Sequence, residues 1–137
     1  MRKTILLGAM FVSSLAFTQQ KSPVVGGDRD VHGCIGSAGY TYSQIKNDCV
    51  KVFEQKIKLK EVNSDKSYTT MTAVIFSKDM KRAEIFIPDG NAKSIILTRE
   101  GKSKIWKSGS YIKEAYVLVP YKKTGYRIKK DDVVIYK

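Results

Sequence analysis

The residues best suited to chemistry lie close together near the start of the chain. Asp28, Asp30 and His32 occupy alternate positions before Cys34, and Cys49 follows fifteen positions later. This alternation suggests a calcium loop or an acid–base group. A calcium loop of the EF-hand kind needs further oxygen ligands at fixed offsets and a closing glutamate, which the residues up to Cys34 do not supply. We therefore expect no metal site here.

The two cysteines are expected to form one structural disulfide. Their spacing is not Cys-x-x-Cys, and His32 is the only histidine, so a redox motif or a zinc site would lack its partners. Two free thiols are the remaining alternative. In an exported chain a Cys34–Cys49 bridge is the simplest pairing. In the chain-entropy model a disulfide that closes a loop of this size stabilises the folded state by about 3 kcal/mol.

Export is indicated by the first residues of the chain. Arg2 and Lys3 precede an apolar run at 5–17, with small residues up to Ala16 where a signal peptidase would read them. Cleavage after Ala16 and cleavage after Thr18 both fit the pattern. An uncleaved anchor is the alternative, but about 13 apolar residues are fewer than the roughly 20 that span a bilayer. We expect a periplasmic or secreted protein without a transmembrane span.

The charge balance points to anionic partners. The 137 residues include 25 Lys and Arg against 13 Asp and Glu, a formal net charge of +12. Loss of a signal peptide with Arg2 and Lys3 leaves 23 basic residues against 13 acidic ones, about +10. Such a surface attracts nucleic acid, lipid head groups or anionic polysaccharide. Export disfavours nucleic acid, as does the spread of the lysines along the chain. Solvated strand faces are the plain alternative.

No catalytic constellation is visible, and we expect a protein that is not an enzyme and has no cofactor. The chain has one histidine, no Gly-x-Ser-x-Gly motif and no phosphate-binding glycine loop with a lysine. Four carboxylates lie on or beside predicted strands: Asp79, Glu84, Asp89 and Glu100. A pair among them at the separation that glycoside hydrolysis requires is the formal alternative.

A helical period precedes the strands. Tyr42, Ile45, Cys49 and Val52 recur at three- and four-residue intervals, which predicts a short helix at 42–52. Cys49 would lie on its apolar stripe, so the disulfide would pin the preceding glycine-rich loop to the helix.

From Phe53 the period becomes two. Ile57 and Leu59 alternate with Lys58 and Lys60, so this strand should turn an apolar face inward and a lysine ladder to solvent. Further strands are expected at 68–77, 83–87, 95–98, 104–107, around Tyr111, and at 115–119, 126–128 and 133–136, with turns at 88–91, 120, 124–125 and 131–132.

These elements predict a mainly β fold. We expect a small antiparallel barrel or sandwich of 7–8 strands with one short N-terminal helix. The chain then divides into a signal peptide (1–18), a loop or flexible arm (19–33) and a single disulfide-pinned β domain (34–137).

One resemblance covers the cysteine region. The run Asp30-Val31-His32-Gly33-Cys34-Ile35-Gly36-Ser37-Ala38-Gly39-Tyr40-Thr41-Tyr42-Ser43, closed by Cys49-Val50-Lys51-Val52-Phe53-Glu54, resembles the amino-terminal signature of a family of small exported bacterial proteins of unassigned function. That family often has tryptophan where this chain has Tyr42. The resemblance implies export and the disulfide, and it implies no activity.

A second resemblance lies in the last third of the chain. Ser108-Gly109-Ser110-Tyr111 is followed, about ten residues after the tyrosine, by Tyr121-Lys122-Lys123-Thr124-Gly125. This order is similar to that of the periplasmic or membrane-bound inhibitors of c-type lysozyme, which are small antiparallel β-barrels. In those inhibitors a serine and a lysine from two loops contact the catalytic carboxylates of lysozyme. The resemblance implies these roles for Ser108 or Ser110 and for Lys122 or Lys123, with Tyr111 and Tyr121 as supporting aromatics.

Two hypotheses of function follow. The first is an exported binding protein that inhibits a wall-degrading glycosidase, a lysozyme or another muramidase. Because c-type lysozymes are basic and this chain is too, an acidic or neutral muramidase is the better target. The second is an envelope protein that binds anionic polysaccharide or lipid through basic strand faces. Ordinary hairpin turns are the structural alternative for both loops.

Overall fold

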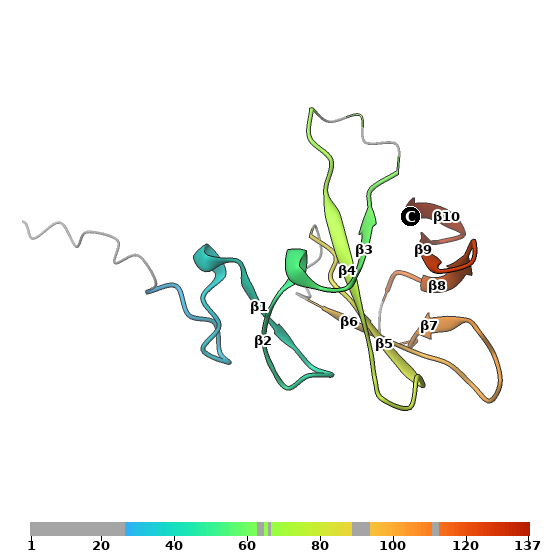
Figure 1. Ribbon diagram of the computed structural model, residues 1–137, viewed down its shortest axis with the longest axis horizontal. Helices are drawn as coiled ribbons and strands as arrows, with labels where there is room; N and C mark the ends of the chain where they lie inside the picture. The colour runs from blue at the N-terminus through green and yellow to red at the C-terminus, as the bar shows by residue number, and fades with distance from the viewer. Residues whose placement is uncertain (1–26, 63–64, 66, 89–93, 111–112) are drawn as a thin grey trace, which may run out of the picture.

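The computed structural model describes residues 27–62, 65, 67–88, 94–110 and 113–137. The predicted signal peptide at 1–18 and the predicted strand residue Tyr111 lie outside these residues. Within them, two sheets are present: a two-stranded hairpin and an eight-stranded antiparallel sheet that curls into a nearly closed barrel (Figure 1). The prediction of a mainly β antiparallel barrel is confirmed.

The barrel strands follow one another in sequence order, each paired antiparallel with the next. They are β3 (Ile57–Lys60), β4 (Met71–Phe76), β5 (Arg82–Ile85), β6 (Ile95–Thr98), β7 (Trp106–Ser108), β8 (Tyr116–Tyr121), β9 (Gly125–Lys130) and β10 (Val133–Tyr136). Short turns suffice for such a meander because neighbouring strands run in opposite directions.

The first and last strands meet and almost close the barrel. Lys60 N donates to the Lys137 carbonyl at 2.9 Å, and Lys137 N donates back to the Lys60 carbonyl at 3.0 Å. Val62 N adds a third bond, to the Ile135 carbonyl at 2.8 Å. Closure satisfies backbone groups that an edge strand would leave exposed.

Side-chain alternation fills the barrel interior. Each of the eight strands contributes at least one buried apolar side chain to a single cluster, and Ile85, Leu97, Leu118 and Ile128 are completely buried. On β3, Leu59 is buried while the lysines on either side are exposed, so the predicted lysine ladder is confirmed. The core is therefore assembled from period-two patterns that are visible in the sequence.

Aromatic rings close one end of this core. Phe76 packs against Trp106 and Tyr126 with ring centroids 4.9 and 5.1 Å apart. The indole Nε1 of Trp106 donates to the Met80 carbonyl at 2.9 Å, so the polar atom of this buried ring is satisfied.

The predicted turn at Pro120 is wrong, because β8 continues through it to Tyr121. The register of β8 with β7 stops at Leu118, so Pro120 is paired only with Tyr126 of β9. Proline has no backbone N–H to donate. It is tolerated in a strand at a position that is paired with a neighbouring strand on one side only.

The predicted helix at 42–52 is also wrong. These residues form a hairpin of β1 (Tyr40–Ser43) and β2 (Asp48–Lys51), followed by the 3-10 turn η2 (Val52–Glu54). Asn47 has a positive φ of 52°, which reverses the chain where the helix would have continued. Together with the 3-10 turn η1 (Gly36–Ala38), these elements make an N-terminal module at 27–55 that lies against one side of the barrel (Figure 1).

A small apolar cluster and one carboxylate join the module to the barrel. Val50 is buried against Ala73 and Ile75 of β4 and Phe86 after β5. Glu84, on the outer face of β5, is completely buried. Its carboxylate accepts hydrogen bonds from the Ser43 hydroxyl at 2.6 Å and from the backbone N–H groups of Gln44 at 2.8 Å and Ile45 at 3.2 Å. This tertiary contact selects a turn over a helix at 43–47.

Candidate functional site

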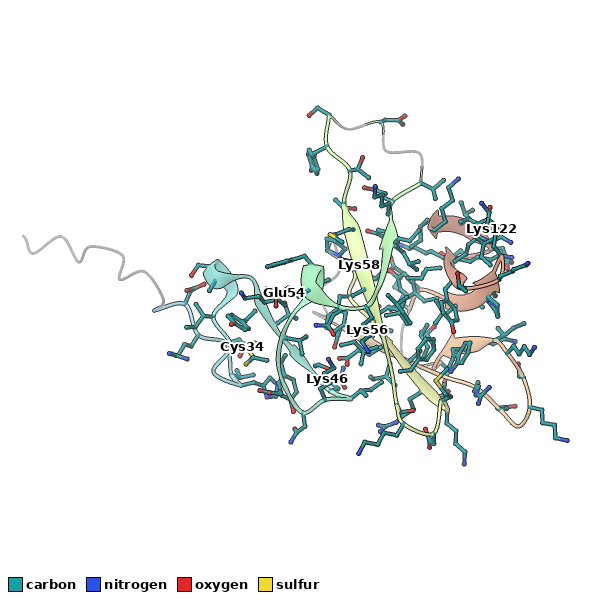
Figure 2. The ribbon with its side chains drawn as sticks, viewed as in Figure 1. Cys34, Lys46, Glu54, Lys56, Lys58 and Lys122 are labelled. Carbon is teal, nitrogen blue, oxygen red and sulfur yellow. A yellow bond between two sulfur atoms is a disulfide. The ribbon has the colours of Figure 1, made fainter. Side chains whose placement is uncertain are left out.

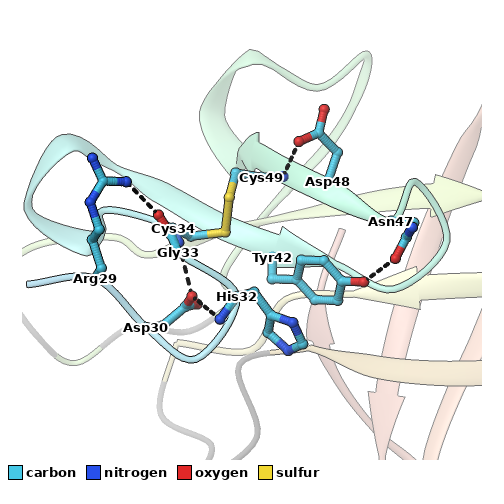
Figure 3. Close-up of a disulfide and its surroundings, with 9 residues drawn as sticks. All are labelled: Arg29, Asp30, His32, Gly33, Cys34, Tyr42, Asn47, Asp48 and Cys49. Carbon is cyan, nitrogen blue, oxygen red and sulfur yellow. Dashed lines mark hydrogen bonds between the residues drawn. A yellow bond between two sulfur atoms is a disulfide. The ribbon is translucent and has the colours of Figure 1, made fainter.

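The disulfide predicted between Cys34 and Cys49 is present, with Cα atoms 5.6 Å apart (Figure 3). It joins the loop before η1 to β2 of the hairpin. Cys34 is 2 % exposed, so the bridge is shielded from solvent on that side. Its place in the module indicates a structural role, since neither sulfur is a free thiol.

The two aspartates before Cys34 serve the loop backbone. Asp30 Oδ1 accepts from the N–H groups of His32 and Cys34, each at 2.9 Å, as Figure 3 shows. Asp28 accepts from the Ser37 N–H at 2.6 Å and the Ser37 hydroxyl at 2.7 Å, and these bonds lower the pKa of Asp28. No metal-like cluster of three His, Cys, Asp or Glu side chains occurs among the described residues.

His32 stacks on an aromatic ring of the hairpin. Its imidazole lies nearly parallel to Tyr42, with ring centroids 3.7 Å apart and an interplanar angle of 8°. The Tyr42 hydroxyl in turn donates to Asn47 Oδ1 in the β1–β2 turn (Figure 3). The only histidine of the chain thus packs on the hairpin.

The serine loop of the predicted binding site lies at the end of β7. The Ser108 hydroxyl accepts from the Tyr116 N–H at 3.0 Å and donates to the Glu114 carbonyl at 3.4 Å. These bonds tie the end of β7 to the start of β8. Ser110 is exposed in the turn that follows, and Tyr111 lies outside the described residues.

The lysine loop lies in the turn between β8 and β9. Lys122 and Lys123 are both exposed there. Lys122 has a positive φ of 54°, and its Nζ lies 5.2 Å from the centre of the Tyr121 ring. Gly125 permits the tight turn, because a Cβ at this position would lie 2.9 Å from the Tyr121 carbonyl oxygen.

The two predicted loops do not meet. β7 and β8 are antiparallel, with Trp106 opposite Leu118, so Ser108 lies beside the first residue of β8 and Lys122 follows its last. The six residues of β8 separate the loops by roughly 20 Å, at about 3.3 Å per residue. A single cleft contact from both loops, as the inhibitor resemblance implies, is not assembled in this register.

A different set of residues gathers around Tyr121. The guanidinium carbon of Arg127 lies 4.2 Å from the centre of the Tyr121 ring, so this ring has both Arg127 and Lys122 as cationic neighbours. Lys129 points to the same outer face, because its partner Val117 alternates with the fully buried Leu118. We call this surface the β8–β9 basic face; it consists of Tyr121, Lys122, Lys123, Arg127 and Lys129.

Sequence reasoning missed two members of this face. Arg127 and Lys129 flank the apolar Ile128, so the period-two pattern of 126–130 already contained the information. What was lacking was the strand register, which brings Arg127 opposite Val119 and next to Tyr121.

Of the four candidate carboxylates, the three in the described part of the chain lie in different elements. Glu84 is buried under the module, and Asp79 accepts from the Ser77 hydroxyl and the Lys81 N–H within the β4–β5 turn. Glu100 is exposed in the β6–β7 connection, and Asp89 lies outside the described residues.

Glu114 lies just before β8, at the end of this strand that is opposite to the β8–β9 turn. It forms an ion pair with Lys130 at 2.8 Å. It also accepts from the Tyr116 hydroxyl at 2.7 Å. The pKa of Glu114 is lowered by these two hydrogen bonds, so the group stays ionised. Glu114 therefore has a structural role: its carboxylate binds Lys130 at the end of β9 and Tyr116 at the start of β8.

No helix in the described part of the chain is long and apolar enough to cross a membrane. Comparisons with protein families, with curated proteins and with solved structures each find no match to this chain.

Proposed function

We propose that this chain is an exported binding protein that holds an anionic polymer of the cell envelope on its β8–β9 basic face. The observation that carries the proposal is the charge of this face. Residues 116–130, which comprise β8, β9 and their turn, contain five Lys and Arg side chains at 122, 123, 127, 129 and 130 and no Asp or Glu. Of these five, only Lys130 is paired with a carboxylate in the described part of the chain.

The arrangement of the cations suits a linear polyanion. Arg127 and Lys129 are two residues apart on one strand, so they project from the same face at roughly 6.6 Å spacing. Lys122 and Lys123 add two further cations in the β8–β9 turn itself. The Arg127 guanidinium lies over the Tyr121 ring, and its Nε is buried. Its two terminal amino groups are therefore the ones to bind phosphate or carboxylate oxygens of a ligand.

The rigid barrel beneath supports this role. Val117 and Val119 lie between the basic residues on the outer face and are half-buried. The strands therefore present the charges from a fixed backbone, and little backbone order has to be gained on binding. The disulfide fits a chain that works in an oxidising compartment.

Retention on an immobilised acidic polysaccharide tests this function. The parent protein should elute only at raised salt, because surface charge interactions are screened. The double variant Lys122→Gln with Lys129→Gln should elute at clearly lower salt. The matched control is Lys102→Gln with Lys104→Gln, which removes the same charge from the exposed β6–β7 connection. Equal elution of the two double variants would mean that net charge alone governs retention.

Inhibition of a muramidase is the second candidate, and one observation favours it. Lys122 and Lys123 are exposed at a hairpin tip, where an ammonium group can enter a cleft that carries catalytic carboxylates. Ser108 would not contribute, since it lies at the far end of β8. Residual activity of acidic and basic muramidases should be measured with the parent protein and with Lys123→Ala. No inhibition of any member of the panel would exclude this candidate.

A further inference from the structure

Basic and aromatic side chains surround η2 on the N-terminal module. Lys46 Nζ donates to Gln55 Oε1 at 2.9 Å, and Lys58 Nζ donates to the Phe53 carbonyl at 3.2 Å. In Figure 2 Lys58 is labelled beside this turn, with Lys56 and then Lys46 below it, and all three lie well to one side of Lys122. We call this surface the η2 patch; it consists of Tyr40, Lys46, Lys51, Phe53, Lys56 and Lys58.

Phe53 is the apolar centre of the η2 patch. Its side chain is 50 % exposed, and it belongs to neither apolar cluster of the described residues. Gly39 packs closely against the Phe53 ring. It has a φ of +80°, and a Cβ there would lie 2.9 Å from Phe53 Cε1. The 3-10 turn and this glycine contact therefore hold a large apolar ring out toward solvent.

The charge around Phe53 is strongly positive. Four lysines belong to the patch. Of the carboxylates beside them, Glu54 is paired with Lys51 at 3.3 Å, and Asp48 lines a pocket together with Lys46. The four lysines thus outnumber these two carboxylates. Lys51 also lies 5.2 Å from the centre of the Tyr40 ring and 5.8 Å from that of Phe53, so cation and aromatics form one surface.

We propose that the η2 patch docks the protein on an anionic phospholipid bilayer. Phe53 enters the head-group layer, and the lysines lie against the lipid phosphates. An apolar tip surrounded by cations matches the two attractions that such a surface offers, burial of apolar area and the negative surface potential. This inference goes beyond polymer binding and concerns a different part of the molecule from the β8–β9 basic face.

A bilayer suits this patch better than a sugar polymer does. Sugar rings bind aromatic side chains through the flat ring face, and the Lys51 ammonium already lies over one face of the Tyr40 ring and one face of the Phe53 ring. Insertion of a side chain into the head-group layer needs no open face. Phe53 is half-exposed, so its insertion would remove apolar area from water.

Vesicle sedimentation tests the proposal. The parent protein should bind mixed phosphatidylglycerol–phosphatidylcholine vesicles and not vesicles of phosphatidylcholine alone. Phe53→Ala should weaken binding roughly tenfold, from lost apolar burial. Lys58→Gln should weaken it roughly fivefold, from one lost surface charge. Val133→Ala and Lys104→Gln are the matched controls, since both side chains are exposed outside the patch, and they should bind as the parent does.

A fluorescent variant reports insertion directly. Trp106 is the only tryptophan and is 3 % exposed inside the barrel, so its emission should not respond to vesicles. Phe53→Trp should shift its emission to shorter wavelength on anionic vesicles, whereas Val133→Trp should not. Circular dichroism and Trp106 emission of Phe53→Ala and Lys58→Gln, compared with the parent, check that these variants are folded.

Three outcomes would overturn the proposal: unchanged vesicle binding by folded Phe53→Ala, equal binding to neutral vesicles, or bound Phe53→Trp without an emission shift. If Phe53→Ala binds vesicles unchanged, bound Phe53→Trp shows no emission shift, and Lys58→Gln binds more weakly, the patch is a cationic surface without apolar insertion. These results are independent of retention on an immobilised acidic polysaccharide through Lys122 and Lys129, so failure of the two proposals can be told apart.

Discussion

The barrel and the N-terminal module carry two basic surfaces on very different supports. The barrel has a continuous interior to which all eight strands contribute, and its closing strands are hydrogen-bonded to each other. The module is a two-stranded hairpin with short 3-10 turns, and an isolated hairpin of this kind is at best marginally stable in water. Its order depends on the disulfide, on Val50 and on the Glu84 carboxylate.

This difference predicts unequal robustness of the two surfaces. The β8–β9 basic face is built on strands of the barrel, so it should persist as long as the barrel is folded. The η2 patch takes Tyr40, Lys46, Lys51 and Phe53 from the module, while Lys56 precedes β3 and Lys58 lies on it. Its module residues should depend on three anchors that can be removed one at a time. Each anchor gives a way to separate the two regions experimentally.

Removal of the disulfide should have the largest effect. The double variant Cys34→Ser with Cys49→Ser loses a bridge that spans 15 positions, worth about 3 kcal/mol through the entropy of the unfolded chain. We expect limited proteolysis to cut within 27–55 while Trp106 emission stays that of the folded barrel. Vesicle binding should fall, and retention on acidic polymer should persist. Simultaneous loss of both binding activities and of the Trp106 signal would show that module and barrel unfold as one unit.

Loss of the Glu84 carboxylate should have the next largest effect. In Glu84→Gln an amide N–H₂ replaces one acceptor oxygen and faces hydroxyl or backbone N–H donors of 43–45, which should cost about 1–3 kcal/mol. The free energy of unfolding in urea measures the loss, and proteolysis within the module locates it. Glu100→Gln is the matched control, because Glu100 is exposed. A change no larger than that of the control would mean that the apolar cluster alone holds the module.

The smallest expected effect is on the pH dependence of stability, and it concerns Glu114 in the barrel. The hydrogen bonds from Lys130 and Tyr116 lower the pKa of Glu114 below its ordinary value of 4.5. Because the folded pKa is the lower one, this stabilisation is present above pH 4.5 and is lost as the pH falls through the lowered pKa. The Tm of Glu114→Gln should therefore fall less on acidification than that of the parent. An identical fall in both proteins would assign the acid sensitivity to other groups, among them Asp28 in the module.

Local pattern predicted the strands well and the hairpin badly. The predicted strands at 95–98 and 133–136 coincide with β6 and β10. In β6 the burial alternates along the strand, so a few consecutive residues were enough to predict it. A helix was predicted at 42–52 because Tyr42, Cys49 and Val52 fit a helical spacing. This prediction is wrong, since these residues lie in β1, β2 and η2. The bonds from Ser43, Gln44 and Ile45 to Glu84 come from some forty residues away, and no local pattern contains them.

The β class, the inward and outward faces of the strands, the basic charge and the cysteine pairing follow from composition and short-range spacing, so they could be predicted from the residues alone. Which loops are neighbours could not be predicted in this way. Antiparallel pairing of β7 with β8 sends Ser108 and Lys122 to opposite ends of one strand, and the β8–β9 register brings Arg127 to Tyr121 instead. The reason is physical: register and closure arise from contacts between distant segments, and such contacts decide which side chains share a surface.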